Sequence, residues 1–395
     1  MNEQTNENTA AELHDELFTE LLACFINETE PLLPDCADIG GLVAAAYMQN
    51  LLPVLAWLDR KWRLFGSGEL SSALKRTVYA NASRRHAFGL LSKKLTEGGI
   101  AHLPVKGLYL AELYPIPELR TFGDIDILIR PGDRNAVHKL LVEDGFTVET
   151  DWEPTYSYRR GAEFYEVHTN IMDKNISGAA DMKAYFAAAW EHSRRRDGLL
   201  YELSPEFHFI YILCHLAKHL HGGGAGMRMY LDAALFVKRH GEGMDWRYVS
   251  GELESLGLGR FFATVMNALK CWFGTEPPLP LPEADVNTLD ELKRFTLGAD
   301  LFGHARDRSA VRIRNAGSTS RMGLILRRIF PPAEEIEARY TFIKGRRWLL
   351  PAAWAARLFT NASRVRKEAE GMKRLAQTDN TAVMSHDAFM KKIGL

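Results

Sequence analysis

The stretch Leu119–Arg130 reads Leu-Arg-Thr-Phe-Gly-Asp-Ile-Asp-Ile-Leu-Ile-Arg, with two carboxylates two residues apart in an apolar, β-branched run. Alternate side chains of a strand point to opposite faces of a sheet. We therefore expect Asp124 and Asp126 to project together, and the neighbouring isoleucines to face a core. Adjacent carboxylates repel each other unless a cation joins them. The pattern indicates a divalent metal site; the alternative is a solvent-facing edge strand, on which acids are tolerated.

The bulk composition is that of an ordinary globular protein. The chain has 395 residues, of which 46% are hydrophobic and 25% charged, enough for more than one domain. Its net charge of -1 does not favour a nucleic-acid binder. The four cysteines form no Cys-x-x-Cys pair, which indicates reduced thiols. Since the N-terminus does not resemble a signal peptide and no long apolar span is present, we expect a cytoplasmic protein without a transmembrane segment.

The order of predicted elements indicates an α+β protein. We expect residues 1–12 to be disordered, and helices to occupy residues 13–65 and about 70–95. From residue 101, short apolar runs alternate with helical ones, which predicts a small mixed sheet with helices packed on it. The expected strands lie at residues 100–105, 123–130, 146–150, 156–160 and 163–170, and helices follow from residue 204 nearly to the end. The chain then divides into an N-terminal helical segment (1–79), a mixed-sheet domain (80–200) and a C-terminal helical domain (201–395).

Two basic positions near the acidic pair suit phosphate binding. Lys106 and Gly107 stand at a junction from a strand into a short helix, where a glycine lets backbone N–H groups approach an anion. Arg120 carries a guanidinium fork that matches phosphate oxygens. For both cations the alternative is a surface ion pair that contributes little.

A third carboxylate follows on a later strand. Glu166 shares a strand face with His168, and could either complete a metal site or accept a proton from an attacking hydroxyl. Its rival is Glu163 in the same strand, if Glu166 is merely an exposed acid. His168 is expected to orient Glu166 or to touch the substrate.

These residues carry a resemblance to a known family. The chain resembles the nucleotidyltransferase superfamily with the polymerase-β-like fold, and within it a bacterial family of uncharacterised nucleotidyltransferases. The motifs are Lys106-Gly107, Leu119-Arg120, Gly123-Asp124-Ile125-Asp126 and, after Leu140, Gly145-Phe146. The similarity extends to Glu166-Val-His168, His215, His219, Arg228, Leu231-Asp232, Phe330-Pro-Pro and Tyr340.

The resemblance implies a catalytic domain at residues 80–200 that transfers a nucleoside monophosphate from a nucleoside triphosphate such as ATP to a small-molecule or protein acceptor, releasing pyrophosphate. It implies two Mg²⁺ ions held by Asp124, Asp126 and Glu166, and these three as the catalytic residues. Contacts to the nucleotide would come from Lys106, Gly107, Arg120, Gly123 and His168. The helices that carry His215, Arg228 and Asp232 would form one wall of the acceptor pocket.

The phosphate loop departs from the superfamily pattern, and leaves a second function open. Most members have Gly-Ser or Gly-Gly there, whereas this chain has Lys106-Gly107-Leu108 and lacks the serine hydroxyl. The alternative is therefore a catalytically weak or inactive accessory protein of a biosynthetic pathway that kept the fold. A polynucleotide-tailing enzyme is a third alternative, which the near-neutral charge disfavours.

Two further patterns favour structural interpretations. His215 and His219 share a helical face, but Leu216 stands where zinc proteases have glutamate, so a zinc site is not expected. The C-terminal region is basic, with clusters at residues 327–328, 344–347 and 364–367. Peripheral contact with a membrane or RNA is conceivable for such a segment, but a helix solvated on one face is the favoured interpretation.

Overall fold

The computed structural model describes residues 2–66, 68–172, 176, 180–298, 323, 326–327, 329–336, 340–343, 345–359 and 380–395. The chain forms two compact units. The first comprises Met1–Glu149, Glu153–Ala305 and Ile393–Leu395, and the second Thr150–Trp152 and Arg306–Lys392. The predicted boundaries at residues 79 and 200 fall inside the first unit, and the three-segment division stays a prediction.

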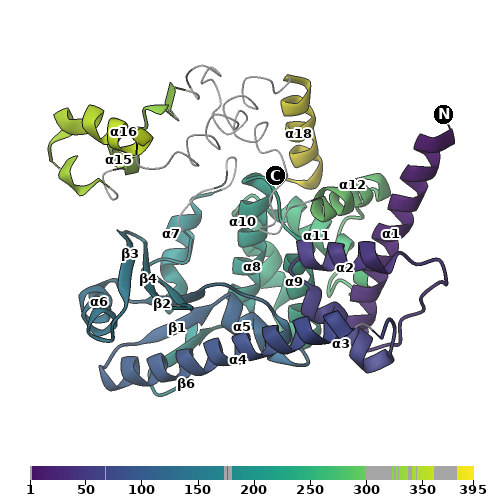
Figure 1. Ribbon diagram of the computed structural model, residues 1–395, viewed down its shortest axis with the longest axis horizontal. Helices are drawn as coiled ribbons and strands as arrows, with labels where there is room; N and C mark the ends of the chain where they lie inside the picture. Colours follow the sequence, from purple (N-terminus) through teal and green to yellow (C-terminus); the bar gives the residue numbers. More distant parts are fainter. Residues whose placement is uncertain are drawn as a thin grey trace. The chain divides into compact units, whose positions relative to one another are not determined.

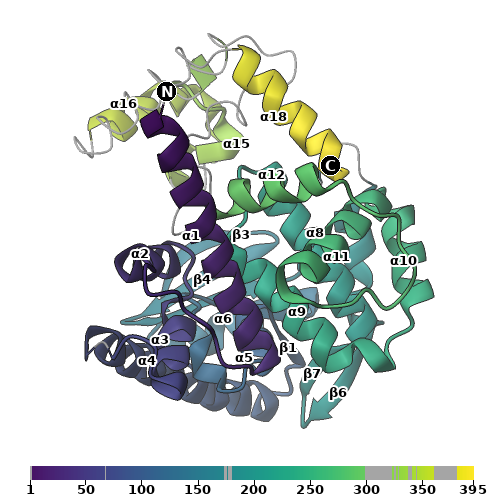
Figure 2. The ribbon, with the colours of Figure 1, turned by 90° about the vertical axis from the view of Figure 1, so that its right-hand side faces the viewer.

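The N-terminal part is helical, as the sequence predicts. Its helices are α1 (Asn2–Asn27), α2 (Ile39–Met48), α3 (Leu52–Trp62) and α4 (Gly68–Glu97). Helix α1, prominent in Figure 2, begins at Asn2, so the first residues are helical where we expected disorder. Figure 1 shows the long helix α4 running beside the strands.

A mixed sheet of seven strands forms the centre of the first unit, in the order β3-β4-β5-β2-β1-β7-β6. The strands are β1 (His102–Val105), β2 (Ile125–Ile129), β3 (Thr147–Trp152), β4 (Thr155–Arg160), β5 (Glu163–His168), β6 (Ser193–Asp197) and β7 (Leu200–Leu203). Strand β2 pairs with β1 in antiparallel and with β5 in parallel orientation. The α+β prediction is therefore confirmed, and five of the strands lie where the sequence places them.

Strands β6 and β7 were not predicted. Strand β6 is Ser-Arg-Arg-Arg-Asp, and four of its five residues are exposed. It lies at the edge of the sheet and pairs with β7 alone. An edge strand that faces water needs no apolar alternation, so the sequence gives no periodic signal for it.

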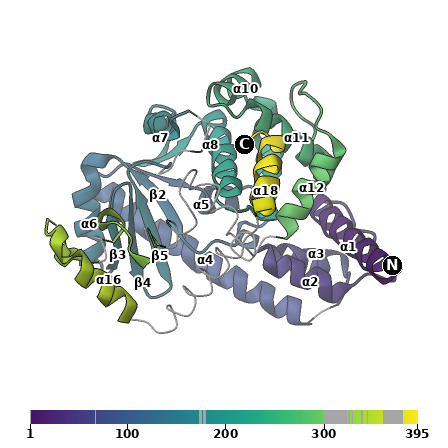
Figure 3. The same ribbon diagram turned by 90° about the horizontal axis from the view of Figure 1, so that it is seen from above.

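The two faces of the sheet differ in chemistry. Ile125, Ile127 and Ile129 of β2 are buried in one apolar cluster with side chains from α4, from α5 (Gly107–Ala111) and from α6 (Arg134–Glu143). Asp126 alternates with them and faces the other way, as the period of the strand predicts. This second face borders a cavity that helices α8 (Pro205–His221) and α9 (Met227–His240) also line. Figure 3 shows α8 beside the strands.

The remaining helices of the first unit are α7 (Met182–Phe186), α10 (Trp246–Ser255), α11 (Gly259–Phe273) and α12 (Val286–Leu297). Local chemistry fixes the starts of α8, α10 and α12, whereas α11 has no side-chain cap hydrogen bond. The side chain of Ser204 accepts a hydrogen bond from Phe207 N and Pro205 opens α8, while Asp245 and Asp285 cap α10 and α12. No helix among the described residues is long and apolar enough to cross a bilayer.

The second unit contains α15 (Ala333–Ile336), α16 (Leu350–Phe359) and most of α18 (Asn380–Ile393). A small apolar cluster of Ala333, Ile336, Ile343 and Ala353 forms its core. The predicted basic clusters lie largely outside the described residues, since Arg328, Lys344 and residues 364–367 are not among them.

Gly107 is the glycine on which the strand-to-helix junction depends. A Cβ atom added there would lie 3.0 Å from Phe122 Cβ and 3.1 Å from Phe122 Cγ. Overpacking of this kind costs about 1–3 kcal/mol. We expect Gly107→Ala to lower the free energy of unfolding by this amount in urea denaturation. Gly123→Ala, which meets nothing within 4 Å, is the control and should change it little; equal effects would contradict the assignment.

Candidate active site

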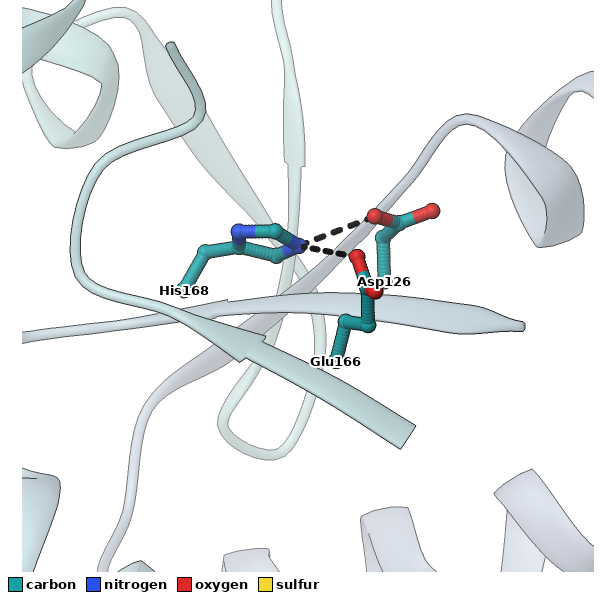
Figure 4. A group of neighbouring side chains, drawn as sticks. All are labelled: Asp126, Glu166 and His168. Atoms are coloured by element: carbon teal, nitrogen blue, oxygen red, sulfur yellow. Dashed lines mark hydrogen bonds and ion pairs between the residues drawn. The ribbon is translucent and has the colours of Figure 1, made fainter. Parts of the chain in front are cut away.

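Strand pairing brings Asp126 and Glu166 side by side. Asp126 of β2 lies opposite Glu166 of the parallel strand β5, and both side chains point to the cavity face. His168, two residues further along β5, joins them on that face. Its Nε2 atom lies 2.9 Å from Asp126 Oδ1 and 3.7 Å from Glu166 Oε2 (Figure 4). The structure thus supports Glu166 over its rival Glu163, whose carboxylate pairs with Arg160.

Hydrogen bonding fixes the orientation of the His168 ring. Its Nδ1 atom lies 3.0 Å from Thr155 Oγ1 of β4, while Nε2 faces Asp126. A carboxylate only accepts, so Nε2 of a neutral ring donates to Asp126 and Nδ1 accepts from the Thr155 hydroxyl. Because that hydroxyl can also accept a hydrogen bond, the opposite tautomer, with a lone pair at Nε2, fits the same pocket.

Lys106 delivers the nearest positive charge. Its Nζ atom lies 2.7 Å from the same Asp126 Oδ1, in the half-buried space between β1 and α5. The backbone of Lys106 has φ 52° and ψ -113°, a conformation that favours glycine. The fold therefore holds a lysine in a costly conformation, and this conformation places its ammonium group at the acidic residues.

Charge and burial act in opposite directions on the carboxylates. Burial raises the pKa of Asp126, but the ammonium of Lys106 and the imidazole of His168 outweigh it and hold that pKa below its usual range. Burial, followed by the negative charge of Asp126, raises the pKa of Asp124 and that of Glu166. Asp126 is thus the firmly ionised member, and Glu166 is a readier proton acceptor than an exposed glutamate.

The donor set suits a divalent cation. One potential ligand atom each from Asp126, Glu166 and His168 lies within 4.8 Å of the other two. Two carboxylates and one imidazole are ligands that Mg²⁺, Mn²⁺ and Zn²⁺ accept in proteins. Asp124 lines the cavity but is not a member of this group. Its role as a ligand stays a prediction, whereas the structure adds His168 to the potential ligands.

Arg120 occupies a place that the sequence did not predict. Its side chain is buried, with Nε 2.8 Å from Asp232 Oδ1 and Nη2 2.7 Å from Asp232 Oδ2 of α9. The Tyr114 hydroxyl donates to the same carboxylate over 2.9 Å, and Arg120 Nη1 lies 3.4 Å from the Gly107 carbonyl. Asp232 engages the Nε–Nη2 edge of the guanidinium, so a bidentate phosphate contact through that edge would break this ion pair.

The loop that leads into β2 is fixed from three sides. Asn81 of α4 is buried and donates to the carbonyl oxygens of Glu118 and Arg120 at 2.8 and 3.0 Å. Arg228 of α9 donates to the Thr121 carbonyl at 2.7 Å, and the Thr121 hydroxyl donates to the Asn50 carbonyl at 2.8 Å. The approach to Asp124 is thus held by residues from three separate parts of the chain.

A cavity of about 860 Å³ adjoins the acidic residues. Asp124, Asp126 and Lys106 line it. Basic side chains from four other elements or loops line it, namely Arg76 and Arg84 of α4, Arg120, Arg159 of β4 and Arg228 of α9. Helix α8 contributes His208, Tyr211, Ile212, His215 and His219. A cavity lined by both carboxylates and arginines suits a polyanion that carries a metal ion.

Two basic residues of this cavity were not assigned to phosphate from the sequence. Arg84 Nη1 donates to Asn81 Oδ1 at 3.0 Å, and the buried Arg84 Nε has no hydrogen-bond partner among the described residues. Burial and the positive charge of Arg120 lower the pKa of Arg228. The sequence predicted a helix over about residues 70–95, but no sequence pattern indicated which partner the face with Arg76 and Arg84 meets.

His215 and His219 lie on the cavity wall. Their Nε2 atoms are 3.1 Å apart. Burial, followed by the neighbouring His219, holds the pKa of His215 well below its usual value. Among the described residues, no third ligand joins them in a metal group.

The family profile described as "Uncharacterised nucleotidyltransferase" matches residues 35–274. The match covers more than half of the chain and contains all the site residues described above. The chain belongs to this nucleotidyltransferase family. Neither the curated proteins nor the solved structures give a significant match. The family resemblance predicted from the motifs is thereby confirmed.

The backbone strain at Lys106 can be measured with two substitutions that both remove the ammonium group. Lys106→Gly and Lys106→Ala lose the same ion pair, but only glycine adopts φ 52° and ψ -113° without penalty. We expect the glycine variant to be more stable in urea denaturation by about 1–3 kcal/mol. The same comparison at Lys139, on the exposed face of helix α6, should reverse the order, since glycine is the poorer helix former.

The Arg120–Asp232 pair predicts a strong asymmetry between single and double substitutions. Asp232→Leu leaves a buried guanidinium unpaired, which costs about 3–5 kcal/mol of unfolding free energy. Arg120→Met together with Asp232→Leu removes both charges, so the double variant should lose less than the sum of the singles. Guanidinium denaturation of the double-mutant cycle measures this coupling. The exposed pair Lys139–Glu143 is the control, and additive losses at Arg120 and Asp232 would argue against a buried pair.

Proposed function

We propose that this protein transfers a nucleoside monophosphate from a nucleoside triphosphate to an acceptor, with release of pyrophosphate. The observation that carries the proposal is the group Asp126, Glu166 and His168, of which Asp126 lines a cavity that arginines also line. Membership of a nucleotidyltransferase family supports the class of reaction. We further propose that the reaction takes place in the cytoplasm, with ATP as one triphosphate to test.

The proposal includes a polymerase-β-like catalytic core. Its elements are β1, the short helix α5, the acidic strand β2 and the strand β5 that pairs beside it. In this arrangement one strand-to-helix junction and two acidic strands meet at one face of the sheet. The helices α8 and α9 then complete the cavity, as the resemblance implies for an acceptor wall.

Mg²⁺ would be held by Asp126 and Glu166, with His168 beside them and Asp124 as a further candidate ligand. When bound, it would supply positive charge to the phosphates and lower the pKa of the attacking hydroxyl. Asp126 is prepared for this role because its pKa is held low, so the carboxylate stays ionised at physiological pH.

The phosphate contacts would come from Lys106, Arg84 and Arg228. The buried Arg84 Nε has no hydrogen-bond partner among the described residues, and the positive charge of Arg120 acts on the buried Arg228. The unpaired donor and the repulsion between like charges both cost free energy. An anion between Arg84 and Arg228 would offset both costs, because it would accept from the donor and reduce the repulsion. We assign Arg120 to positioning: it holds Gly107 and Asp232 and leaves the phosphates to its neighbours. Gly123, next to Asp124, leaves space beside that carboxylate, since a Cβ atom added at Gly123 would meet nothing within 4 Å.

Glu166 would act on the acceptor side. The acceptor oxygen attacks the α-phosphorus, the bond from that phosphorus to the α,β-bridging oxygen breaks, and pyrophosphate leaves with its electron pair. The acceptor proton passes to Glu166, whose pKa is raised by burial and by the charges of Asp126 and Asp124. The acceptor would be a small hydroxyl- or amine-bearing molecule or a protein side chain.

The proposal is tested by pyrophosphate release from each of the four NTPs with Mg²⁺ and an extract of small molecules as acceptor source. Asp126→Asn removes the central carboxylate charge, which should lower turnover by about a thousandfold or more, since several kcal/mol of charge stabilisation are lost. Asp124→Asn is the companion variant. Circular dichroism checks folding, and Asp197→Asn on the exposed strand β6 is the control.

Retained turnover in both Asp124→Asn and Asp126→Asn would rule out the proposal. Calorimetry with Mg²⁺ and each NTP separates the enzyme from a non-catalytic accessory protein. Heat of binding is expected with at least one NTP; no heat with any would favour the accessory alternative.

A further inference from the structure

The contacts of Lys106 bear on how many cations the site takes. Its Nζ atom lies 2.7 Å from Asp126 Oδ1, and the Asp126 side chain is only 3% exposed. A lysine ammonium group therefore already lies on the central carboxylate.

The backbone at Lys106 holds its side chain at Asp126. A residue at φ 52° and ψ -113° costs free energy unless its surroundings require it. Leu110 N donates to the Lys106 carbonyl at 2.8 Å, and a Cβ atom added at Gly107 would lie 3.0 Å from Phe122 Cβ. The strand-to-helix junction thus sets the direction of the Lys106 side chain. A lysine on a flexible surface segment, in contrast, could point in many directions.

The potential ligands describe one ion. Among the described residues, Asp126, Glu166 and His168 form the group whose ligand atoms lie within 4.8 Å of one another, and Asp124 is outside it. His168 can offer the lone pair of Nε2, because Thr155 Oγ1 at 3.0 Å can accept a hydrogen bond from Nδ1–H. This supplies an imidazole nitrogen beside two carboxylates.

Charge balance points the same way. If Asp124, Asp126 and Glu166 are ionised, one divalent cation and one ammonium neutralise them. The phosphates meet their own cations in Arg84 and Arg228 on the cavity walls. A second metal ion would therefore add charge that the protein already provides.

We propose that the site takes a single divalent cation, held by Asp126, Glu166 and His168, and that the Lys106 ammonium replaces the second cation. The proposal rests on the proposed function and departs from the two Mg²⁺ ions that the family resemblance implies. The nitrogen ligand also favours Mn²⁺ over Mg²⁺, since imidazole suits transition metals better than Mg²⁺.

The test counts bound Mn²⁺ on the full-length protein by electron paramagnetic resonance, without nucleotide, because bound Mn²⁺ loses the sharp signal of the free ion. One Mn²⁺ per chain is expected for the unaltered protein. Spin-echo modulation should show a directly coordinated ¹⁴N, which His168→Gln should abolish. Two Mn²⁺ per chain, or one without ¹⁴N coupling, would overturn the inference and leave a metal-dependent transferase standing. No bound Mn²⁺ would overturn the inference, and the turnover assay with NTP would still decide the proposed function.

The substitution Lys106→Met keeps the length of the side chain and removes its charge. We expect it to admit a second Mn²⁺ per chain, with an affinity at least tenfold higher than any second binding to the unaltered protein. Lys106→Arg keeps a cation and should still bind one. Lys139→Met, on the exposed face of α6, is the matched control. A folded Lys106→Met variant that binds one ion would contradict the role of Lys106.

Discussion

The buried ion pair of Arg120 and Asp232 joins the loop before β2 to helix α9. A buried pair of this kind pays a large desolvation cost, which is offset only when the remaining donors and acceptors are satisfied. Here the Tyr114 hydroxyl and the Gly107 carbonyl complete the network. Helices α8 and α9, which follow the sheet, line the same cavity as its strands.

The cavity brings two kinds of charge together. Its lining combines the carboxylates of Asp124 and Asp126 with arginines from α4, α9, β4 and the loop before β2. Two of these arginines are already paired, Arg120 with Asp232 and Arg159 with Glu149. Lys106 is likewise held against Asp126, by a backbone conformation that glycine would adopt more easily. A costly conformation maintained beside titratable groups is characteristic of functional sites.

Much of the sheet and part of the site could be predicted from the sequence. Alternation in β2 placed Asp126 opposite a core of isoleucines, and the structure confirms it. The motif around Lys106 and Gly107 indicated a strand-to-helix junction, which is also confirmed. The ion pair that Arg120 forms could not be predicted, because its partner Asp232 lies 112 residues away. No local period encodes which helix will meet a given loop.

The sequence by itself therefore determined much of the local structure: five of the seven strands, the helical character of the segments on either side of the sheet, and which face of β2 is apolar. These follow from periods of two and about 3.6 residues and from capping residues. The tertiary structure alone decided which charges meet. It paired Arg120 with Asp232, and it brought His168 to Asp126 across 42 residues. The physical reason is that packing and burial select among charged partners over the whole chain, and a buried charge must be paired wherever its partner lies in the sequence.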